Sequence, residues 1–436
     1  MVAVEHMDQS ITYGELNDRS NIVASYLMLR GIQVGDYVAV VTSRSINMIV
    51  AILGVLKSGA GYIPIDAEVP SDRIRTIIEK GDPKFIIVND LPDQSLSLKD
   101  SKWIEFHQIS SDVAYQSPII PRVSPCYVTF TSGSTGVPKG VIVSHGSLSN
   151  FVNAEESFLG LTEGQRVAQI CSIGFDLCVG EIFLTLSAGC TLVLRQKDDF
   201  FAALKIVDCA FMTPTTLLKM EPEDFPNLKY VAVAGEPIYA PQVEKWAGKV
   251  KLKNSCGPTE ITVVSSGTIL KVGQPITIGK PLENTVQYIV DKNLQLLPLG
   301  VAGELVIGGA GVALGYLNDI EKTNASFIPN HFANDGTKMY RTGDICRWTE
   351  DGELQILGRE DDMVKVKGYR IELNEVSLAV EKHPDVTGAT VLVKNDVLVA
   401  YVTPKQVDID SIREVVMNAL PYYMTPSAFI TLEQFP

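Results

Sequence analysis

The N-terminal part of the chain alternates between helix-like and strand-like segments, and this alternation constrains the fold more than any other feature. The apolar spacing predicts a helix over Tyr13–Leu29, closed by Gly31, followed by a strand at Tyr37–Val41. A buried helix in "INMIVAILGVLK" and another that starts at Ser71, as its N-cap, repeat the pattern before a strand at Phe85–Val88. Such alternation favours an α/β sheet with parallel strand pairs.

The predicted pattern of secondary structure changes twice further along the chain. Short apolar runs at Thr191–Leu194, Cys209–Met212 and Tyr230–Val233 continue the α/β pattern, whereas strand-and-turn sequence after about Val286 predicts a β-rich subdomain. After Asp361 a strand, a helix and a hairpin follow. We therefore expect a large N-terminal part of layered α/β sheets plus the β-rich subdomain over residues 1–360, and a small, mobile α+β C-terminal domain over 361–436.

Composition excludes several classes of protein. The 436 residues include 46% hydrophobic and 20% charged residues, as in globular chains, and the net charge of −14 with no basic stripe argues against a nucleic-acid partner. The seven cysteines lack metal-binding spacing, which predicts buried thiols in a reducing, cytoplasmic compartment. No apolar run approaches the ~18 residues that span a membrane, and the charged N-terminus is not that of a signal peptide.

The stretch "YVTFTSGSTGVPKGVIVSH" places a loop of glycines and hydroxyls between two strand-like runs. It is not a Walker A loop, because Pro138 precedes Lys139 and no Ser or Thr follows the lysine. Glycines let backbone N–H groups approach an anion, and hydroxyls and a lysine add donors. The loop therefore predicts a phosphate cradle, and the alternative is a flexible hairpin loop.

Three acids stand in distinctive contexts: Asp176 in "GFDLCVGE", Glu260 in "NSCGPTE" and Asp344 in "YRTGD". Each also has an ordinary structural explanation, as a helix N-cap, a solvated turn and a loop cap respectively.

Taken together, the motifs resemble those of the adenylate-forming enzymes, and most closely the adenylation domains of nonribosomal peptide synthetases. In chain order they are "ITYGEL", "LKSGAGYIPIDAEVPSDRI", "TSGSTGVPKG", "FDLCVGEIF", "NSCGPTE", "GELVIGGAGVALGYLND", "YRTGD", "GREDDMVKVKGYRIELNEVS" and "LPYYMTPSAF". Fatty-acyl and aryl-CoA ligases share several of them, so a free-standing acyl- or aryl-CoA ligase is the alternative, and a nucleotide-binding member with impaired catalysis is a third possibility.

The resemblance implies an AMP-forming ligase. ATP and Mg²⁺ would convert an amino acid to aminoacyl-AMP and pyrophosphate, and the phosphopantetheine thiol of a carrier domain, expected on the same native polypeptide, would then take the aminoacyl group. The isolated domain is expected to be a monomer.

The resemblance also implies roles for individual residues. Thr131, Ser132, Lys139 and Glu260 would be catalytic, with Glu260 the Mg²⁺ ligand, and Asp361 would be the hinge of the small domain. The nucleotide site would comprise Gly133, Ser134, Thr135, Gly136, Gly235, Glu236, Pro237, Asn254, Ser255, Cys256, Gly257, Thr259, Asp344 and Arg359.

Asp176 resembles the acid that pairs with the α-ammonium of an amino acid, since a buried carboxylate needs a cation. The side-chain pocket would be lined by Leu177, Gly180, Met212, Ala232, Ala234, Ser255, Val263 and Val264. With no acid or lysine among them, the wall favours a bulky, uncharged or weakly polar side chain. Aromatic and long aliphatic residues fit, as does an acylated hydroxyornithine of the siderophore synthetases.

Two departures from the family pattern matter. Cys256 stands where the family usually has an aromatic residue that stacks on adenine. The sequence ends at Pro436, before the segment that carries the family's catalytic lysine, so either tail and loops are omitted or the domain is truncated.

Overall fold

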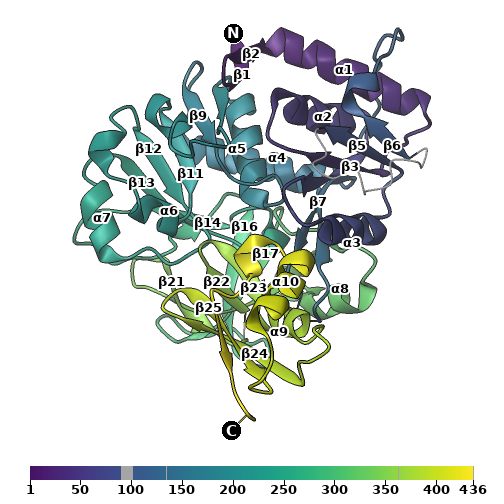
Figure 1. The fold of residues 1–436 in the computed structure, drawn as a ribbon. Coiled ribbons are helices and arrows are strands. Elements are labelled where there is room, and N and C mark those ends of the chain that lie inside the picture. The colour runs from purple at the N-terminus through teal and green to yellow at the C-terminus, as the bar shows by residue number, and fades with distance from the viewer. Residues whose placement is uncertain (90–101, 134, 362, 436) are drawn as a thin grey trace.

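The computed structural model describes residues 1–89, 102–133, 135–361 and 363–435. Its core is built from two adjacent, largely parallel sheets covered by helices (Figure 1). The first sheet has the order β18-β8-β7-β4-β3-β5-β6. Its strands are β3 (Tyr37–Thr42), β4 (Gly61–Asp66), β5 (Phe85–Asn89), β6 (Trp103–Glu105), β7 (Pro125–Thr131), β8 (Lys139–Ser144) and β18 (Gly315–Tyr316).

The second sheet has the order β15-β14-β13-β12-β11-β9-β10-β1-β2. Its strands are β1 (Val2–His6), β2 (Gln9–Thr12), β9 (Arg166–Gln169), β10 (Thr191–Leu194), β11 (Cys209–Met212), β12 (Tyr230–Val233), β13 (Lys251–Cys256), β14 (Ser266–Ile269) and β15 (Lys280–Pro281). Strands β10, β11 and β12 coincide with the three predicted runs, and all four residues of each strand are buried, as expected for central strands of a parallel sheet covered on both faces.

The helices begin and end largely where the sequence predicts. Thr12 and Glu15 form a capping box at the start of α1, which runs over the expected Tyr13–Leu29. The predicted N-cap at Ser71 is wrong: Ser71 is the first helical residue and Pro70 precedes it without a side-chain cap. The remaining helices are α2 (Ile46–Lys57), α3 (Ser71–Gly81), α4 (His145–Leu159), α5 (Asp176–Ser187), α6 (Pro214–Leu218), α7 (Ala240–Trp246), α8 (Ile320–Ser326), α9 (Leu373–Val380) and α10 (Ile409–Ala419).

The predicted β-rich region forms a third, antiparallel sheet below the first two (Figure 1). It has the order β16-β17-β20-β19, with β21 paired to β20. The strands are β16 (Thr285–Val290), β17 (Gly303–Gly309), β19 (Phe327–Pro329), β20 (Lys338–Trp348) and β21 (Leu354–Arg359).

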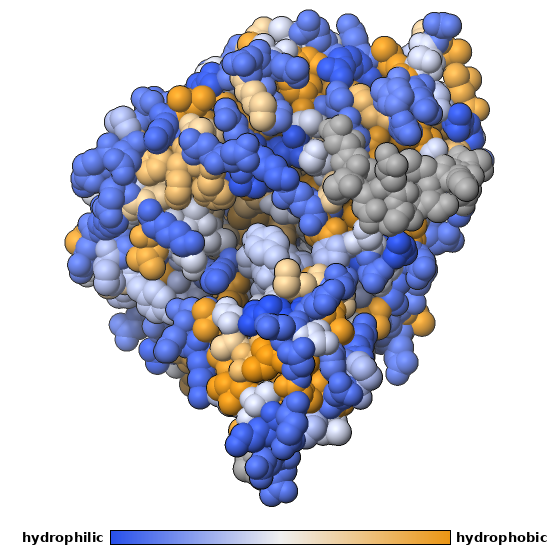
Figure 2. All heavy atoms as spheres, viewed as in Figure 1, coloured by the Kyte–Doolittle hydropathy of each residue, from blue (hydrophilic) through white to orange (hydrophobic). Residues whose placement is uncertain are grey.

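The C-terminal residues form a small α+β unit with its own apolar core, drawn in yellow-green and yellow in Figure 1. The hairpin β22–β23 precedes α9, and the predicted hairpin over Gly388–Thr403 pairs β24 with β25. The strands are β22 (Met363–Val366), β23 (Tyr369–Glu372), β24 (Gly388–Lys394), β25 (Val397–Thr403) and β26 (Ala428–Thr431). The surface is hollowed where this unit meets the rest of the molecule (Figure 2).

The observed architecture confirms the predicted α/β class with a large N-terminal part and a small C-terminal part. None of the helices in the described residues is long and apolar enough to cross a membrane.

Candidate active site

The predicted phosphate loop lies between the antiparallel strands β7 and β8, at the edge of a cleft. A Cβ atom on Gly133 would lie 2.0 Å from the carbonyl oxygen of Val137, and Gly136 has a φ of +78°, so the loop needs glycine at both places. The Thr131 hydroxyl is buried and has no hydrogen-bond partner among the described residues. Such an unpartnered donor beside a glycine cradle suits the phosphates of a nucleotide. Ser134 lies outside the described residues, and Thr135 is exposed at the loop tip.

Glu260 lies fully buried in a short 3₁₀ turn after β13, between three groups that favour its charge. Burial opposes ionisation, but Arg370, Lys139 and the Tyr316 hydroxyl together hold the pKa of Glu260 at about 2. The Tyr316 hydroxyl donates to its carboxylate over 2.8 Å. Burial, with Arg370 nearby, lowers the pKa of Lys139 to about 8.

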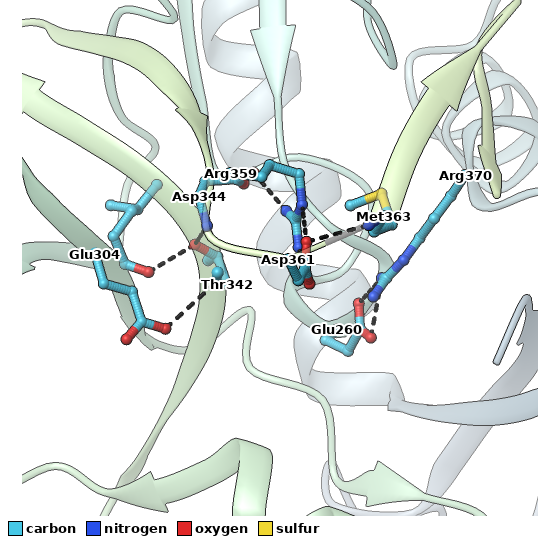
Figure 3. A network of polar contacts seen from close by, with 10 residues as sticks. Glu260, Glu304, Thr342, Asp344, Arg359, Asp361, Met363 and Arg370 are labelled. Carbon is cyan, nitrogen blue, oxygen red and sulfur yellow. Dashed lines mark hydrogen bonds and ion pairs between the residues drawn. The ribbon is translucent and has the colours of Figure 1, made fainter. Parts of the chain in front are cut away.

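Arg370, on β23 of the C-terminal unit, forms an ion pair with Glu260, the residue that was predicted to hold Mg²⁺. Its Nη1 atom lies 2.9 and 3.1 Å from the two carboxylate oxygens of Glu260 (Figure 3). The oxygen ligand expected for Mg²⁺ is therefore present and ionised, but a divalent cation would have to displace the guanidinium. The described residues contain no cluster of three or more His, Cys, Asp or Glu side chains that could hold a metal ion.

Further contacts attach the C-terminal unit to the phosphate loop. Ser132 donates its hydroxyl to the Arg370 carbonyl over 2.8 Å, and the Gly133 N–H donates to the Glu375 carboxylate over 2.9 Å. Glu375 also pairs with Arg73 of α3 at 3.0 Å, and Glu372 lies 3.6 Å from Lys139. In this arrangement carboxylates of β23 and α9 take the donors that phosphate oxygens would otherwise use.

The turn between β22 and β23 fits closely against the large part of the molecule. Lys367 and Gly368 both have positive φ, as a tight two-residue hairpin turn requires. A Cβ atom on Gly368 would lie 2.2 Å from the Thr213 side chain, and one on Gly235 would lie 3.4 Å from the Gly368 carbonyl oxygen. Gly235, predicted to bind the nucleotide, lines the cleft and lies against this turn, and its φ of +88° favours glycine there.

Asp344, the predicted ribose-binding acid, lies in the cleft wall on β20. Arg359 on β21 donates a hydrogen bond of 2.5 Å to the Asp344 carboxylate. It also donates two hydrogen bonds, of 2.7 and 2.8 Å, to the Asp361 carboxylate (Figure 3). The Thr342 hydroxyl donates to the Leu305 carbonyl and accepts from the Asp344 N–H, which holds the middle of β20 in place. The predicted hinge residue is therefore linked to the predicted nucleotide site through one guanidinium.

Asp176 is the first residue of α5 and faces the same cleft. Loss of hydration raises its pKa to about 6, although the Thr259 side chain and the Leu177 N–H donate hydrogen bonds to it. No Lys, Arg or His of the described residues makes an ion pair with it. Its carboxylate therefore lacks a cationic partner.

A buried polar cluster fixes the loop that leads into Asp176. Glu181, one turn further along α5, accepts from the backbone N–H groups of Ile170 and Cys171 and from the Gln169 amide. Arg44 binds the same segment through the Gln169 amide oxygen and two carbonyls. Burial raises the pKa of Glu181 to about 7.

The predicted side-chain pocket divides between two neighbouring cavities. Leu177, Ala234 and Val263 line both cavities. The larger cavity adds Asp176 and Met212, and the smaller adds Gly180, Ala232, Ser255 and Val264. The expectation that no acid lines this pocket is wrong, because Glu155 of α4 lines the smaller cavity.

Some predicted nucleotide residues do not line the main cleft as the structure describes it. Glu236 accepts from the Thr215 N–H, and Asn254 donates its amide to the Thr277 carbonyl. Pro237 is exposed, and Cys256 is the last residue of β13, next in sequence to the cleft residue Gly257, with its thiol pKa raised by burial. Gly257 and Thr259 do line the cleft.

Comparison with known proteins places this geometry in a family. The model for the AMP-binding enzymes matches residues 1–317. The chain is 36% identical over its whole length to adenylate-forming reductase 03009 of Coprinopsis cinerea, covering 43% of that protein. It is 38% identical to nonribosomal peptide synthetase sirP of Leptosphaeria maculans, covering 20% of it. The chain thus spans less than half the length of these relatives.

Solved structures agree with the fold. A nonribosomal peptide synthetase protein with adenylation and PCP domains is 25% identical, with a TM-score of 0.90 over all of this chain and 79% of that one. A four-domain nonribosomal peptide synthetase bound to AMP and glycine is 32% identical, with a TM-score of 0.74 over all of this chain and 34% of that one. The chain therefore belongs to the AMP-binding enzyme family, and its fold matches that of solved nonribosomal peptide synthetase proteins with adenylation domains.

Proposed function

We propose that this domain activates an amino acid with ATP and then passes the aminoacyl group to the phosphopantetheine thiol of a carrier domain. The observation that carries the proposal is the convergence of Thr131, Asp176, Thr259 and Asp344 on one cleft, although they come from distant parts of the chain.

In the first reaction, a carboxylate oxygen of the amino acid attacks the α-phosphorus of ATP, and pyrophosphate leaves. The glycine loop, the Thr131 hydroxyl and Lys139 would bind the phosphates and stabilise the charge that develops on them. Asp344 would accept the ribose hydroxyls, since a carboxylate can accept two hydrogen bonds. Mg²⁺ on Glu260, once Arg370 has moved away, would neutralise phosphate charge.

Asp176 would bind the substrate ammonium. It lines both the main cleft and the adjacent larger cavity, so an ammonium there would leave the carboxylate of the amino acid near the phosphates and the side chain in the pocket. A half-buried acid without an ion-pair partner among the described residues gains most from such a ligand.

The second reaction requires a carrier domain, which we place on the same native polypeptide by analogy with the adenylation–PCP protein. We propose that rotation about Asp361 moves the C-terminal unit between the two reactions, since the Arg359–Asp361 pair marks the boundary of that unit.

Exchange of labelled pyrophosphate into ATP, across a panel of amino, fatty and aryl acids, tests the proposal. We expect exchange with an amino acid and its loss in Asp176→Ala, while Glu244→Ala, an exposed acid on α7, behaves as wild type. Exchange that survives Asp176→Ala and prefers acids without an amino group would identify an acyl- or aryl-CoA ligase instead.

A further inference from the structure

A buried ion pair lies at the far end of the side-chain pocket. Lys253 Nζ lies 2.5 Å from each carboxylate oxygen of Glu155, and the two side chains are 0% and 3% exposed. The ammonium also lies 4.1 Å from the ring centroid of Phe158. Taking two charges out of water is costly, and such a pair often contributes less stability than an apolar pair of the same size. Its position therefore invites a functional explanation.

The pair joins two elements that build the pocket. Glu155 and Phe151 lie one turn apart on α4, and both line the smaller cavity. Lys253 and Ser255 are alternate residues of β13 and so share one face of the strand. Ser255 lines the same cavity, whereas Lys253 does not line it and contacts Glu155, which does.

Several small residues line the smaller cavity together with Glu155. A Cβ atom on Gly180 would lie 3.4 Å from Phe151 and 3.6 Å from Val263, in ordinary contact and without a clash. Alanine would thus fit at position 180 but would narrow the cavity. Ala232, Ala234 and Ser255 add little bulk.

The chemistry of the pair selects a class of ligand. The pair is neutral overall, so it gives no net charge with which to bind a charged side chain. Glu155 accepts only from Lys253 among the hydrogen bonds described, and a carboxylate has about four acceptor positions on its two oxygens. Spare acceptor capacity in an apolar cavity favours a ligand that donates a hydrogen bond.

We propose that Glu155, held by Lys253, is a specificity-determining residue, and that the substrate is an amino acid with a neutral side chain ending in a hydrogen-bond donor. The proposal rests on the proposed function and deepens it. Hydroxyl, carboxamide and indole groups meet the requirement, whereas purely aliphatic and benzyl side chains do not.

Non-reactive aminoacyl-adenylate analogues test the proposal by binding alone, measured calorimetrically. Two nearly isosteric pairs are compared: tyrosyl with phenylalanyl, and asparaginyl with leucyl. The comparison is made in whichever pair binds more tightly to the wild-type protein. There we expect the Kd of the analogue with the hydrogen-bond donor to be lower by roughly a hundredfold or more, because a site built around a hydrogen bond rejects analogues that lack it.

The double variant Glu155→Met/Lys253→Met keeps the side-chain lengths and removes both charges together. We expect the preference within the pair to fall to near unity, and Gly180→Ala to weaken the donor-bearing analogue at least about tenfold. The matched control Glu5→Met/Arg166→Met removes a partly exposed ion pair between β1 and β9, and should keep the wild-type preference.

A wild-type preference for the apolar member, or a double variant that keeps the wild-type ratio, overturns the inference. The wild-type comparison needs no variant, so it decides even if the double variant fails to fold. Failure of every analogue, including a glycyl one, would instead count against the proposed function.

Discussion

Two acids at the candidate site have opposite electrostatic states: Asp176 lines the cleft, and Glu260 is buried next to Thr259, which also lines it. Glu260 is fully buried, yet Arg370, Lys139 and Tyr316 hold its pKa at about 2. Loss of hydration raises the pKa of Asp176 to about 6, since it has hydrogen bonds but no ion-pair partner in the part of the chain that the structure describes. The difference lies in their neighbours, since both carboxylates lose hydration. Arg370 and Lys139 supply the positive charge that stabilises Glu260, whereas we expect a ligand to supply it at Asp176.

The largest expected effect is the loss of the charge on Glu260. Glu260→Gln leaves Arg370 buried without its counter-ion, so the free energy of unfolding should fall by about 3 kcal/mol. Urea denaturation at pH 7 measures this change. The double variant Glu260→Leu/Arg370→Met should recover most of it, and a loss below about 1 kcal/mol in Glu260→Gln would refute the importance of the pair.

At Asp176, replacing the carboxylate by an amide should raise the free energy of unfolding rather than lower it. Asp176→Asn removes a poorly hydrated charge that has no ion-pair partner among the described residues, so we expect the unfolding free energy at pH 7 to rise by about 1–3 kcal/mol. A raised native pKa means that the unfolded chain ionises first as pH rises. The stability gap between variant and wild type should therefore be absent below pH 3.8 and complete above about 6. A variant less stable than wild type at pH 7 would contradict this account.

The rate of amino-acid activation should depend on the protonation of Asp176. Only the ionised acid attracts an ammonium, so kcat/KM for the amino acid should fall about tenfold per pH unit below about 6. Pyrophosphate exchange between pH 5 and 8 measures this slope in the wild type. Asp176→Asn should have low activity without that slope, and the KM for ATP in the wild type should change much less.

The smallest expected effect is a change in ATP affinity at the phosphate loop. The Glu375 carboxylate accepts a hydrogen bond from the Gly133 N–H, which an ATP phosphate would otherwise use. Glu375→Gln weakens this hydrogen bond, so the affinity for ATP should increase roughly three- to fivefold. Calorimetric titration with a non-hydrolysable ATP analogue measures the change. Glu381→Gln, which alters another carboxylate of the C-terminal unit, serves as the control and should leave the affinity unchanged.

Local pattern was enough to predict most of the fold. The boundaries of α1, β10, β11 and β12 follow from apolar spacing, capping residues and short buried runs. Ser71 failed as a cap because Pro70 already sets the backbone at the start of the helix, and a serine cap looks the same in sequence whether or not its side chain accepts a hydrogen bond.

The site was less accessible from sequence because its partners are distant along the chain. The motif "KGYR" stood out, but nothing local indicates that Arg370 reaches Glu260, 110 residues away. Glu155 lies 98 residues from Lys253, within an ordinary amphipathic helix. Charge pairing of this kind needs the fold first, whereas the phosphate loop and the acid-bearing turns carry their own local signals.

The guanidinium at Glu260 has a consequence for control of the enzyme. An arginine stays protonated at any physiological pH, so acidity cannot release this contact. Only another cation can take its place. We expect the free magnesium level, together with nucleotide supply, to decide how long the C-terminal unit stays docked.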